Sequence, residues 1–171
     1  MNERLQRAFY SRDVLEVAPQ LLGQRLVKLD SDGSLSIYLI TETEAYRGME
    51  DLACHASKGR TPRTEVMFGE GGHLYMYLIY GMYWMMNVVT GPEGVPQAVL
   101  FRGLREASGP GRLTRLLGVD RSFYGVDLVS SGQIWIEESG SAPTYTTGPR
   151  VGVEYAGEPW KDKPWRFLMN L

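Results

Sequence analysis

Apolar residues recur at strand spacing through most of the chain, and polar turn residues separate the runs. RLVKLD (25–30) and SLSIYLITETEAY (34–46) flank a Ser-Asp-Gly turn, which predicts a β-hairpin. HLYMYLI (73–79) and MYWMMNVV (82–89) predict a second hairpin, with Gly81 supplying a positive φ at its turn. Four more segments have strand character: QAVLFRGLR (97–105), IWIEE (134–138), RVGVEY (150–155) and WRFLM (165–169).

Helical spacing is limited to two short segments. In residues 11–24 an apolar stripe follows the capping residue Asp13, and we expect Pro19 to kink or restart this helix. A second helix is predicted to begin at Ser108 and to end at Gly118. Because strands dominate and neighbouring strands are joined by hairpins, the sequence predicts an α+β fold that is predominantly β. We expect a single domain with a curved antiparallel sheet or open barrel-like core, a few short helices and a protruding β-hairpin.

The composition is typical of a globular protein that has neither a disulfide nor a metal site. Hydrophobic residues make up 43% of the 171 residues and charged residues 22%, which is enough for one domain with a proper core. The single Cys54 has no internal partner, and one cysteine with two histidines gives no metal-ligand spacing. We therefore expect no metal and no cofactor. With no signal-peptide pattern and no membrane-spanning apolar run, a cytoplasmic protein without membrane contact is expected.

Positive charge is gathered into two segments, although the net charge is −2. The clustered residues are Arg102, Arg105, Arg112, Arg115 and Arg121 in one segment, and Lys58, Arg60 and Arg63 in the other. Arginine outnumbers lysine 14 to 4, and the planar guanidinium fork suits phosphate oxygens better than an ammonium group does. The pattern is compatible with a face that binds nucleic acid, and equally with ordinary solvated faces.

Two glutamates are neighbours on the predicted strand 34–46. Strict alternation places Glu42 and Glu44 on one face, roughly 7 Å apart along the backbone. The same face carries Ile40 and Tyr46. If both carboxylates face a cavity, burial and mutual repulsion raise the pKa of at least one of them, as a general base requires. The alternative is a solvated strand end with no chemical role.

Tyrosines are concentrated in one hairpin: Tyr75, Tyr77, Tyr80 and Tyr83 fall within nine residues. A packed core rarely uses so many phenols, because each buried hydroxyl needs a hydrogen-bond partner. A pocket that stacks flat rings does use them. Tyr80 stands beside glycine at the predicted hairpin tip, where it should be exposed. It fits either a protein contact or a wedge pushed between stacked bases from the minor groove.

Two further polar residues each allow two interpretations. Asn87 is expected on a buried face, where an unsatisfied amide costs roughly 1–3 kcal/mol, so its amide bonds either to the backbone or to the edge of a substrate. His55, taken alone, fits a structural role as well as a functional one.

A set of motifs occurs in order from about residue 10 to the end: ETEAY, His55, GRTPR, MF, HLYMYLIYGMYWMMN, LFRGL, SGP, RVGVEYAGE and KPWRF. Together they resemble the alkyladenine (3-methyladenine) DNA glycosylase family, and in particular its short bacterial members. ETEAY combined with YGMY-x-x-x-N is the most specific part of the match. The resemblance implies one glycosylase domain over residues 1–171 that acts on nucleoid DNA. We expect a monomer, since the protein is small and its task would be to scan a duplex. Its implied partner is double-stranded DNA that carries a damaged purine.

The resemblance also implies roles for individual residues. Glu44 matches the general base that activates the attacking water, and Arg102 matches a basic residue near the reacting nucleotide. Tyr80 matches the residue that enters the minor groove and fills the space left by the flipped nucleotide. Met82 follows that wedge into the groove.

The implied base pocket has aromatic walls. Tyr46, His55 and Tyr77 match the residues between which the flipped base stacks, and the backbone amide of His55 is implied to donate to the purine edge. Asn87 matches a residue whose amide clashes with the 2-amino group of normal guanine. Thr64 departs from the family pattern, since many relatives have asparagine there, and this bears on the range of substrates.

The implied reaction is hydrolysis of the N-glycosidic bond of an alkylated or deaminated purine, the first step of base excision repair. Only four lysines are present, so no amine nucleophile is expected and the enzyme should be monofunctional. Two other classes stay open. A carbohydrate hydrolase would use Glu42 and Glu44 as its acid–base pair, although neighbours on one strand cannot easily flank a sugar. A non-catalytic damaged-DNA-binding module would leave Glu44 as an unexplained repulsive charge.

Overall fold

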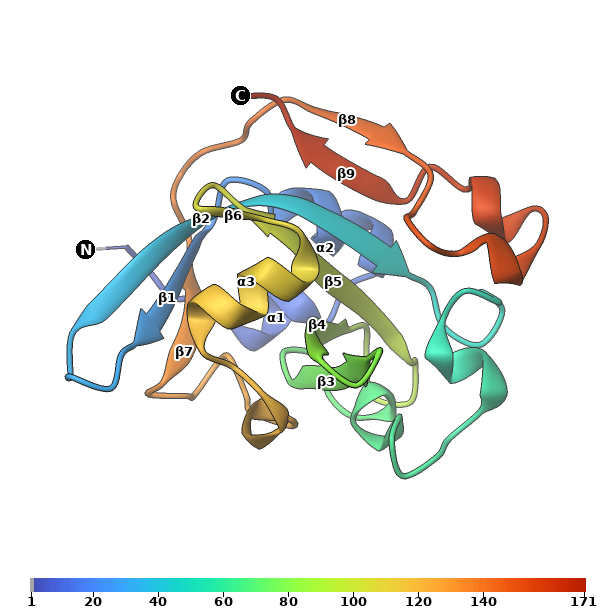
Figure 1. Ribbon diagram of the computed structural model, residues 1–171, viewed down its shortest axis with the longest axis horizontal. Coiled ribbons are helices and arrows are strands. Elements are labelled where there is room, and N and C mark those ends of the chain that lie inside the picture. The colour runs from blue at the N-terminus through green and yellow to red at the C-terminus, as the bar shows by residue number, and fades with distance from the viewer. Residues whose placement is uncertain (1) are drawn as a thin grey trace.

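A nine-stranded antiparallel sheet is the framework of the computed structural model, which describes residues 2–171 (Figure 1). The strands are β1 (Arg25–Leu29), β2 (Leu35–Tyr46), β3 (Leu74–Ile79), β4 (Tyr83–Thr90), β5 (Gln97–Leu104), β6 (Ala107–Ser108), β7 (Ile134–Glu137), β8 (Tyr145–Gly148) and β9 (Arg166–Met169). The main path runs β3-β4-β5-β2-β1-β7, β6 pairs with β5, and the β8–β9 hairpin joins through β9 on β2. Over these residues the path ends at β3 and β7 without closing, which confirms the predicted open antiparallel architecture.

Short helices accompany the sheet in the described part of the chain. They are the α-helices α1 (Arg7–Tyr10), α2 (Val14–Gln20) and α3 (Pro110–Leu117), and the 3₁₀ turns η1 (His55–Lys58), η2 (Glu65–Phe68), η3 (Arg121–Phe123), η4 (Glu154–Ala156) and η5 (Trp160–Asp162). In Figure 1, α1 and α2 lie behind the sheet and α3 lies in front of it. From residue 2 to residue 171, no helix has the length and apolar character needed to cross a bilayer.

The predicted capping of α2 is confirmed, whereas the predicted restart of the helix at Pro19 is not observed. The Asp13 carboxylate accepts a hydrogen bond from the N–H of Leu15 at 2.8 Å. Pro19 lies inside α2, one residue before its end, so it does not start a new helix. Its missing N–H affects only the last turn of this short helix. The Thr43 hydroxyl donates to the Ala18 carbonyl at 2.8 Å, which ties α2 to β2.

One large core holds the sheet against the helices. Its fully buried side chains come from α2, α3 and the central strands, and include Val14, Val17, Leu21, Leu26, Ile40, Phe101 and Leu113. Phe101 faces this core, whereas its neighbours Leu100 and Arg102 on β5 line a cavity on the other face. Burial of one face of β5 therefore fixes the direction of the polar side chains on the opposite face.

The structure differs from the predicted elements at three places. Residues 150–155 form turns and η4 rather than a strand, because Gly152 has φ 73° and the Arg150 side chain is fully buried in an ion pair. Residues 145–148 form the unpredicted β8, which is largely exposed and so has no apolar alternation to reveal it. Ser108 belongs to β6, and α3 begins two residues later, after Gly109 at φ 101°.

A bulge in β2 breaks the strict alternation that the sequence predicts. The pairing of β2 with β5 shifts register on both sides of Glu42. Ile40 and Ala45 consequently both lie in the main core, although uninterrupted alternation would put them on opposite faces. The predicted shared face of Ile40 with Glu42 and Glu44 is therefore wrong, whereas that of the two glutamates is confirmed, since Arg102 approaches both carboxylates.

The loop before β3 depends on a close approach of two backbones at Gly71. A Cβ at this position would lie 2.7 Å from the Tyr10 carbonyl oxygen, an atom that also accepts a hydrogen bond from Gly91. We expect Gly71→Ala to lower the free energy of unfolding by about 1–3 kcal/mol, since backbone rather than a flexible side chain must move. Gly132→Ala, whose Cβ would have no neighbour within 4 Å, is the matched control. Urea unfolding measures both, and equal stability of the two variants would contradict this packing role.

Candidate functional site

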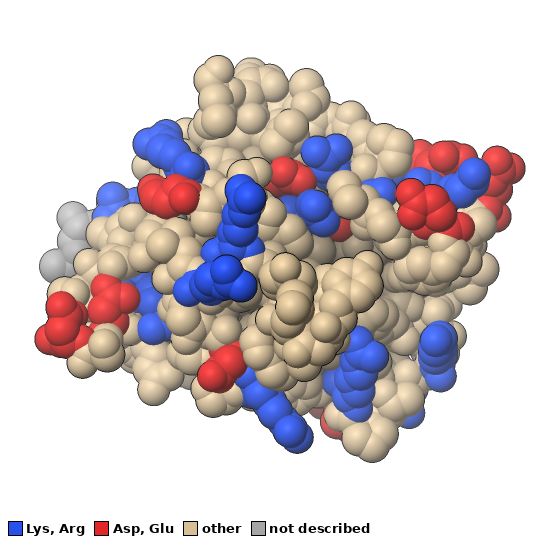
Figure 2. Space-filling model, viewed as in Figure 1, with Lys and Arg blue, Asp and Glu red and all other residues tan. Residues whose placement is uncertain are grey.

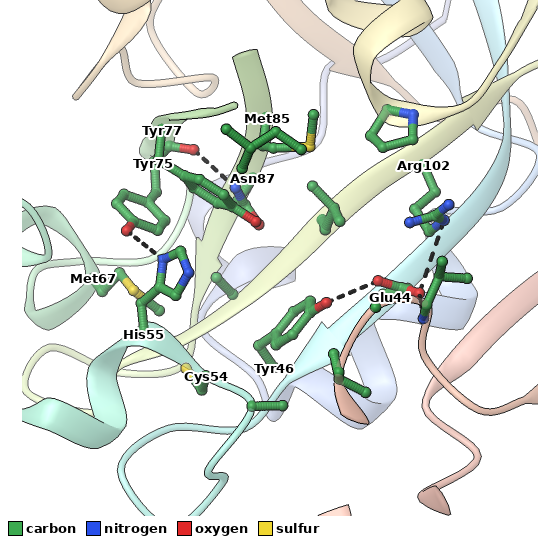
Figure 3. A pocket seen from close by; sticks show the side chains of 18 of the residues that line it. Glu44, Tyr46, Cys54, His55, Met67, Tyr75, Tyr77, Met85, Asn87 and Arg102 are labelled. Atoms are coloured by element: carbon green, nitrogen blue, oxygen red, sulfur yellow. Dashed lines mark hydrogen bonds and ion pairs between the residues drawn. The ribbon is translucent and has the colours of Figure 1, made fainter. Parts of the chain in front are cut away.

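A cavity of about 560 Å³ opens beside the β3–β4 hairpin, a size within the range of small-molecule sites (Figure 3). Its lining includes all six residues predicted for the base pocket and the chemistry: Glu44, Tyr46, His55, Tyr77, Asn87 and Arg102. Tyr80 also borders it, whereas Met82 does not. Five separate segments contribute these side chains, so the cavity is a product of the tertiary structure.

Glu44 is the most constrained polar residue of the cavity. Its side chain is fully buried, with Oε1 accepting a hydrogen bond from the Tyr46 hydroxyl at 2.8 Å and Oε2 accepting one from the N–H of Val151 at 2.7 Å. Burial raises the pKa of Glu44, while Arg102, the Val151 N–H and the Tyr46 hydroxyl oppose that rise. Repulsion by Glu42 adds little, so desolvation rather than the carboxylate pair dominates.

The neighbouring glutamate is already engaged by arginine. Glu42 Oε2 accepts hydrogen bonds from Arg102 Nε at 3.0 Å and from Arg166 Nε at 2.9 Å. Arg102 Nε also lies 3.8 Å from Glu44 Oε2. The two carboxylates thus differ in environment: one is bound to arginines, and the other faces the cavity in a largely desolvated position.

Aromatic rings form one wall of the cavity. His55 and Tyr77 lie 4.5 Å apart between ring centroids, and Tyr75 and Tyr77 lie 5.4 Å apart. The Tyr75 hydroxyl is 2.8 Å from His55 Nδ1. Burial is the main reason that the pKa of Tyr75 is raised to about 12, and burial likewise raises the pKa values of Tyr46 and Tyr77. These phenols therefore remain protonated and uncharged at neutral pH.

His55 is neutral in this setting. Burial, assisted by Arg63 and Lys58, lowers its pKa from 6.5 to about 4. The ring is held by the Tyr75 hydroxyl, and its backbone N–H is at the first position of η1, where no partner within the helix exists. The site thus has an uncharged imidazole against its tyrosines and, at the same position, a backbone N–H without a partner inside η1.

Asn87 is held by the backbone, as one of the two sequence interpretations predicts. Its Nδ2 donates to the Tyr75 carbonyl at 3.1 Å, and only 3% of the residue is exposed. The side chain nevertheless lines the cavity. A single structural bond therefore fixes the orientation of an amide that faces the space where a ligand would lie.

The sequence did not predict the loop that closes the site. Val151, Gly152 and Val153 line the cavity, and they follow Arg150, whose guanidinium contacts the Asp51 carboxylate at 2.5 and 3.0 Å. Both side chains of this pair are fully buried. The signal was present in RVGVEYAGE, but a buried arginine cannot be recognised from the sequence alone, because arginine is nearly always exposed.

The hairpin tip projects beside the cavity. Tyr80 has φ 51° and Gly81 has φ 66°, so both central residues of the turn are left-handed. The exposed fractions of Tyr80 and Met82 are 88% and 62%. A non-glycine residue in this region costs on the order of 1–3 kcal/mol, and such strain concentrates at functional sites. The predicted exposure of Tyr80 is confirmed.

Basic side chains flank this hairpin. Figure 2 shows Lys and Arg side chains over α3 on one side of the hairpin and over residues 58–63 on the other. The exposed members are Arg112 and Arg115 on α3, and Lys58, Arg60 and Arg63 in the other group. Gly111 of α3 packs directly on the Tyr83 ring, which connects the hairpin to the first of these groups.

Comparison with known proteins identifies the family. The family model for methylpurine-DNA glycosylase (MPG) matches residues 8–107 and 105–170. A protein of Anaeromyxobacter dehalogenans (strain 2CP-C) is 48% identical over 177 residues, covering 98% of this chain and 84% of its own. Proteins of Legionella pneumophila (strain Corby) and Methanocella arvoryzae are 46% and 44% identical, covering 98% and 95% of this chain and 94% and 90% of their own. All three are named "Putative 3-methyladenine DNA glycosylase". The chain belongs to the methylpurine-DNA glycosylase family.

Membership of the methylpurine-DNA glycosylase family confirms the resemblance stated from the motifs. It also confirms the enzyme class, a DNA glycosylase that hydrolyses N-glycosyl bonds. Thr64 is 3% exposed and lies outside the cavity lining. Its hydroxyl accepts from the N–H of Thr61 at 2.9 Å and lies 3.1 Å from the Gly59 carbonyl. Thr64 therefore stabilises the turn that carries the basic residues 58–63.

The buried Arg150–Asp51 pair generates a stability prediction. We expect Asp51→Asn to lower the free energy of unfolding by about 3–5 kcal/mol, since it leaves a buried guanidinium without its counter-charge. Glu65→Gln, which removes the carboxylate of an exposed pair with Arg60, is the control and should cost less than about 1 kcal/mol. Urea unfolding at neutral pH measures both, and a loss below 1 kcal/mol for Asp51→Asn would contradict the structural role of the pair.

Proposed function

We propose that this protein is a monofunctional DNA glycosylase that flips an alkylated or deaminated purine out of duplex DNA. It then hydrolyses the N-glycosidic bond with a water activated by Glu44, and so starts base excision repair. One observation carries the proposal: a fully buried carboxylate, fixed by two hydrogen bonds, faces an aromatic cavity next to an exposed tyrosine wedge. The names of the family and of the relatives support the same lesion class.

The wedge would offset the cost of extruding a nucleotide. Extrusion costs a few kcal/mol, and less where the damaged base pairs or stacks poorly. Tyr80 stands 88% exposed at the hairpin tip and would fill the space that the nucleotide leaves, with Met82 beside it in the minor groove. Contacts of the base with aromatic rings return on the order of 1–3 kcal/mol. The Tyr80 wedge and the aromatic pocket together would roughly balance the free-energy cost of extruding the nucleotide.

The flipped base would lie between the rings of Tyr46, His55 and Tyr77. Because burial keeps these tyrosines protonated and the imidazole neutral, the walls carry no charge at neutral pH and favour a flat, electron-poor purine. The backbone N–H of His55 would donate to the purine edge. Asn87, whose amide is fixed by the Tyr75 carbonyl, would exclude normal guanine through its 2-amino group.

Glu44 would supply the chemistry. Its carboxylate takes a proton from water as the water oxygen bonds to the sugar carbon, and the electron pair of the broken N-glycosidic bond leaves with the base. The same negative charge stabilises the oxocarbenium-like sugar, and Arg102 lies beside it. Since burial raises the pKa of Glu44, the active carboxylate is lost at a higher pH on acidification than an exposed glutamate would be.

A lyase activity would need an amine nucleophile in the cavity. Among the described residues that line it, none is a lysine. The product would therefore be an abasic site in an unbroken strand. The carbohydrate hydrolase alternative has lost support, because Glu42 is held by two arginines on the same strand face as Glu44 and cannot take a position across a sugar.

The expected partner is double-stranded DNA, bound by one protein monomer. The groups of basic residues on α3 and at 58–63 would contact phosphates on the two sides of the wedge (Figure 2). A damaged-DNA-binding module without catalysis is the second candidate, because the wedge and the basic groups would serve it equally well. The enzyme class of the family and the buried Glu44 both favour the glycosylase over this module.

Glu44→Gln tests the enzyme directly. In a single-turnover assay on duplexes that carry one hypoxanthine or one alkylated purine, we expect the wild type to release the base. The variant should bind the duplex but release the base at least about 10²-fold more slowly, since the general base is lost. Glu16→Gln on α2, behind β2, is the control and should match the wild type. Tight lesion binding without release by the wild type would instead establish a recognition module.

Tyr80→Gly separates stability from function at the wedge. Glycine adopts a positive φ freely, so we expect the free energy of unfolding to rise by about 1 kcal/mol. Base release from the lesion duplex should fall about ten- to a hundredfold, because the vacated space is no longer filled. Tyr80→Phe keeps the ring and should retain release. Unchanged release by Tyr80→Gly in the single-turnover assay would exclude the wedge role.

A further inference from the structure

Two arginines from different strands converge on one oxygen of Glu42. β2 pairs with β5 on one side and with β9 on the other, and Arg102 and Arg166 come from those two strands. Their Nε atoms lie 3.0 and 2.9 Å from Glu42 Oε2. The two guanidinium groups are therefore held side by side at the edge of the cavity, although like charges repel at such a separation.

Each guanidinium uses only its Nε–H in this arrangement. Among residues 2–171, no acceptor receives a hydrogen bond from the terminal amino groups of Arg102 or Arg166. The side chains are 17% and 31% exposed, so these amino groups have access to solvent. Two adjacent guanidinium groups with unused N–H donors are suited to binding an anion that has several oxygen atoms.

The local charge balance also requires the second arginine. Glu42 and Glu44 place two carboxylates at the site, and Arg102 alone would leave this group with a net charge of −1. DNA carries its own negative charge, so such a site would repel the strand that it must bind. With Arg166 the four side chains are balanced, and a phosphate meets the guanidinium groups rather than an excess of carboxylate.

We propose that Arg102 and Arg166 together bind one phosphodiester of the DNA strand next to the flipped nucleotide, with Glu42 as the positioning residue for both guanidinium groups. The assignment rests on the proposed glycosylase function, because it takes Glu44 as the reacting centre. Arg102 lines the cavity, and Arg166, which is not among the lining residues, shares Glu42 Oε2 with Arg102, so the bound phosphate would lie at the cavity rim. We call Arg102 and Arg166 the phosphate clamp. The clamp would hold the sugar attached to this phosphate in a fixed position relative to Glu44.

The test combines a protein change with a change in the DNA. Duplexes with one hypoxanthine carry a single uncharged methylphosphonate linkage, moved stepwise through the positions on either side of the lesion. We expect one position at which neutralisation weakens wild-type binding and slows single-turnover release about tenfold. With Arg166→Gln the same linkage should have almost no further effect, because the contact that it removes is already lost.

Salt dependence provides a second readout. Arg166→Gln should lower the slope of log affinity against log salt concentration by roughly 1, as expected for one phosphate contact. Arg166→Lys keeps the charge and should restore most of the slope. Arg12→Gln is the matched control, since Arg12 bonds to Gln20 of α2 on the opposite face of β2 and should leave the slope unchanged.

Glu42→Gln tests the positioning role. It keeps the size of the side chain but removes the charge that holds the two guanidinium groups together, so release should slow while the salt slope stays near that of the wild type. Glu42→Gln should also reduce the loss of binding caused by the methylphosphonate at the position identified with the wild type. Far-UV circular dichroism and thermal unfolding establish that each variant is folded; if Arg166→Gln is not, Arg166→Lys combined with the methylphosphonate scan decides.

The outcomes separate this proposal from the proposed function. If the wild type releases the base but Arg166→Gln keeps the wild-type salt slope and methylphosphonate response, Arg166 is a purely structural partner of Glu42 and the clamp is wrong. If the wild type releases no base but its binding still responds to the same linkage through Arg166, the phosphate site stands and the catalytic proposal fails.

Discussion

The site depends on the buried ion pair between Arg150 and Asp51. Both side chains are fully buried, and the Arg150 guanidinium also donates to the carbonyls of Ala45 and Trp160 and lies over the Tyr46 ring. It therefore joins the end of β2 to the loop that follows β8. The next residue, Val151, donates its N–H to Glu44. Breaking a desolvated pair of this kind is costly, so the pair holds the loop that orients Glu44 against the end of β2.

The two neighbouring glutamates acquire different properties from their surroundings. Glu44 is fully buried and its pKa is raised chiefly by desolvation, whereas Glu42 is held by arginines from the flanking strands. The bulge that shifts register at Glu42 lies between these environments. One strand thus provides a buried carboxylate that faces the cavity and, two residues away, a carboxylate held by arginines from the strands on either side.

Local strain and exposure are concentrated on the hairpin that borders the cavity. Tyr80 combines a left-handed backbone with an almost fully exposed ring, a combination that reduces stability and offers no packing in return. Helix α3 supports the hairpin through β4. Gly111 of α3 lets the Tyr83 ring approach closely, and the Thr114 hydroxyl donates to the Trp84 carbonyl. A rigid base with a solvent-exposed aromatic tip is suited to a binding role.

Periodicity and turn chemistry are local properties, and they were sufficient to predict the antiparallel β class, both hairpins and the Asp13 cap from the sequence. Six of the residues that line the cavity were named through the resemblance of the motifs to a known family, not through periodicity. The sequence also identified the family, because the motifs and their order along the chain can be recognised without the structure. The β2 bulge, the turn at 150–155, β8, and the partners of Glu42 and Glu44 became visible only in the three-dimensional structure. Those features depend on pairing between distant segments and on desolvation, neither of which is encoded by the spacing of neighbouring residues.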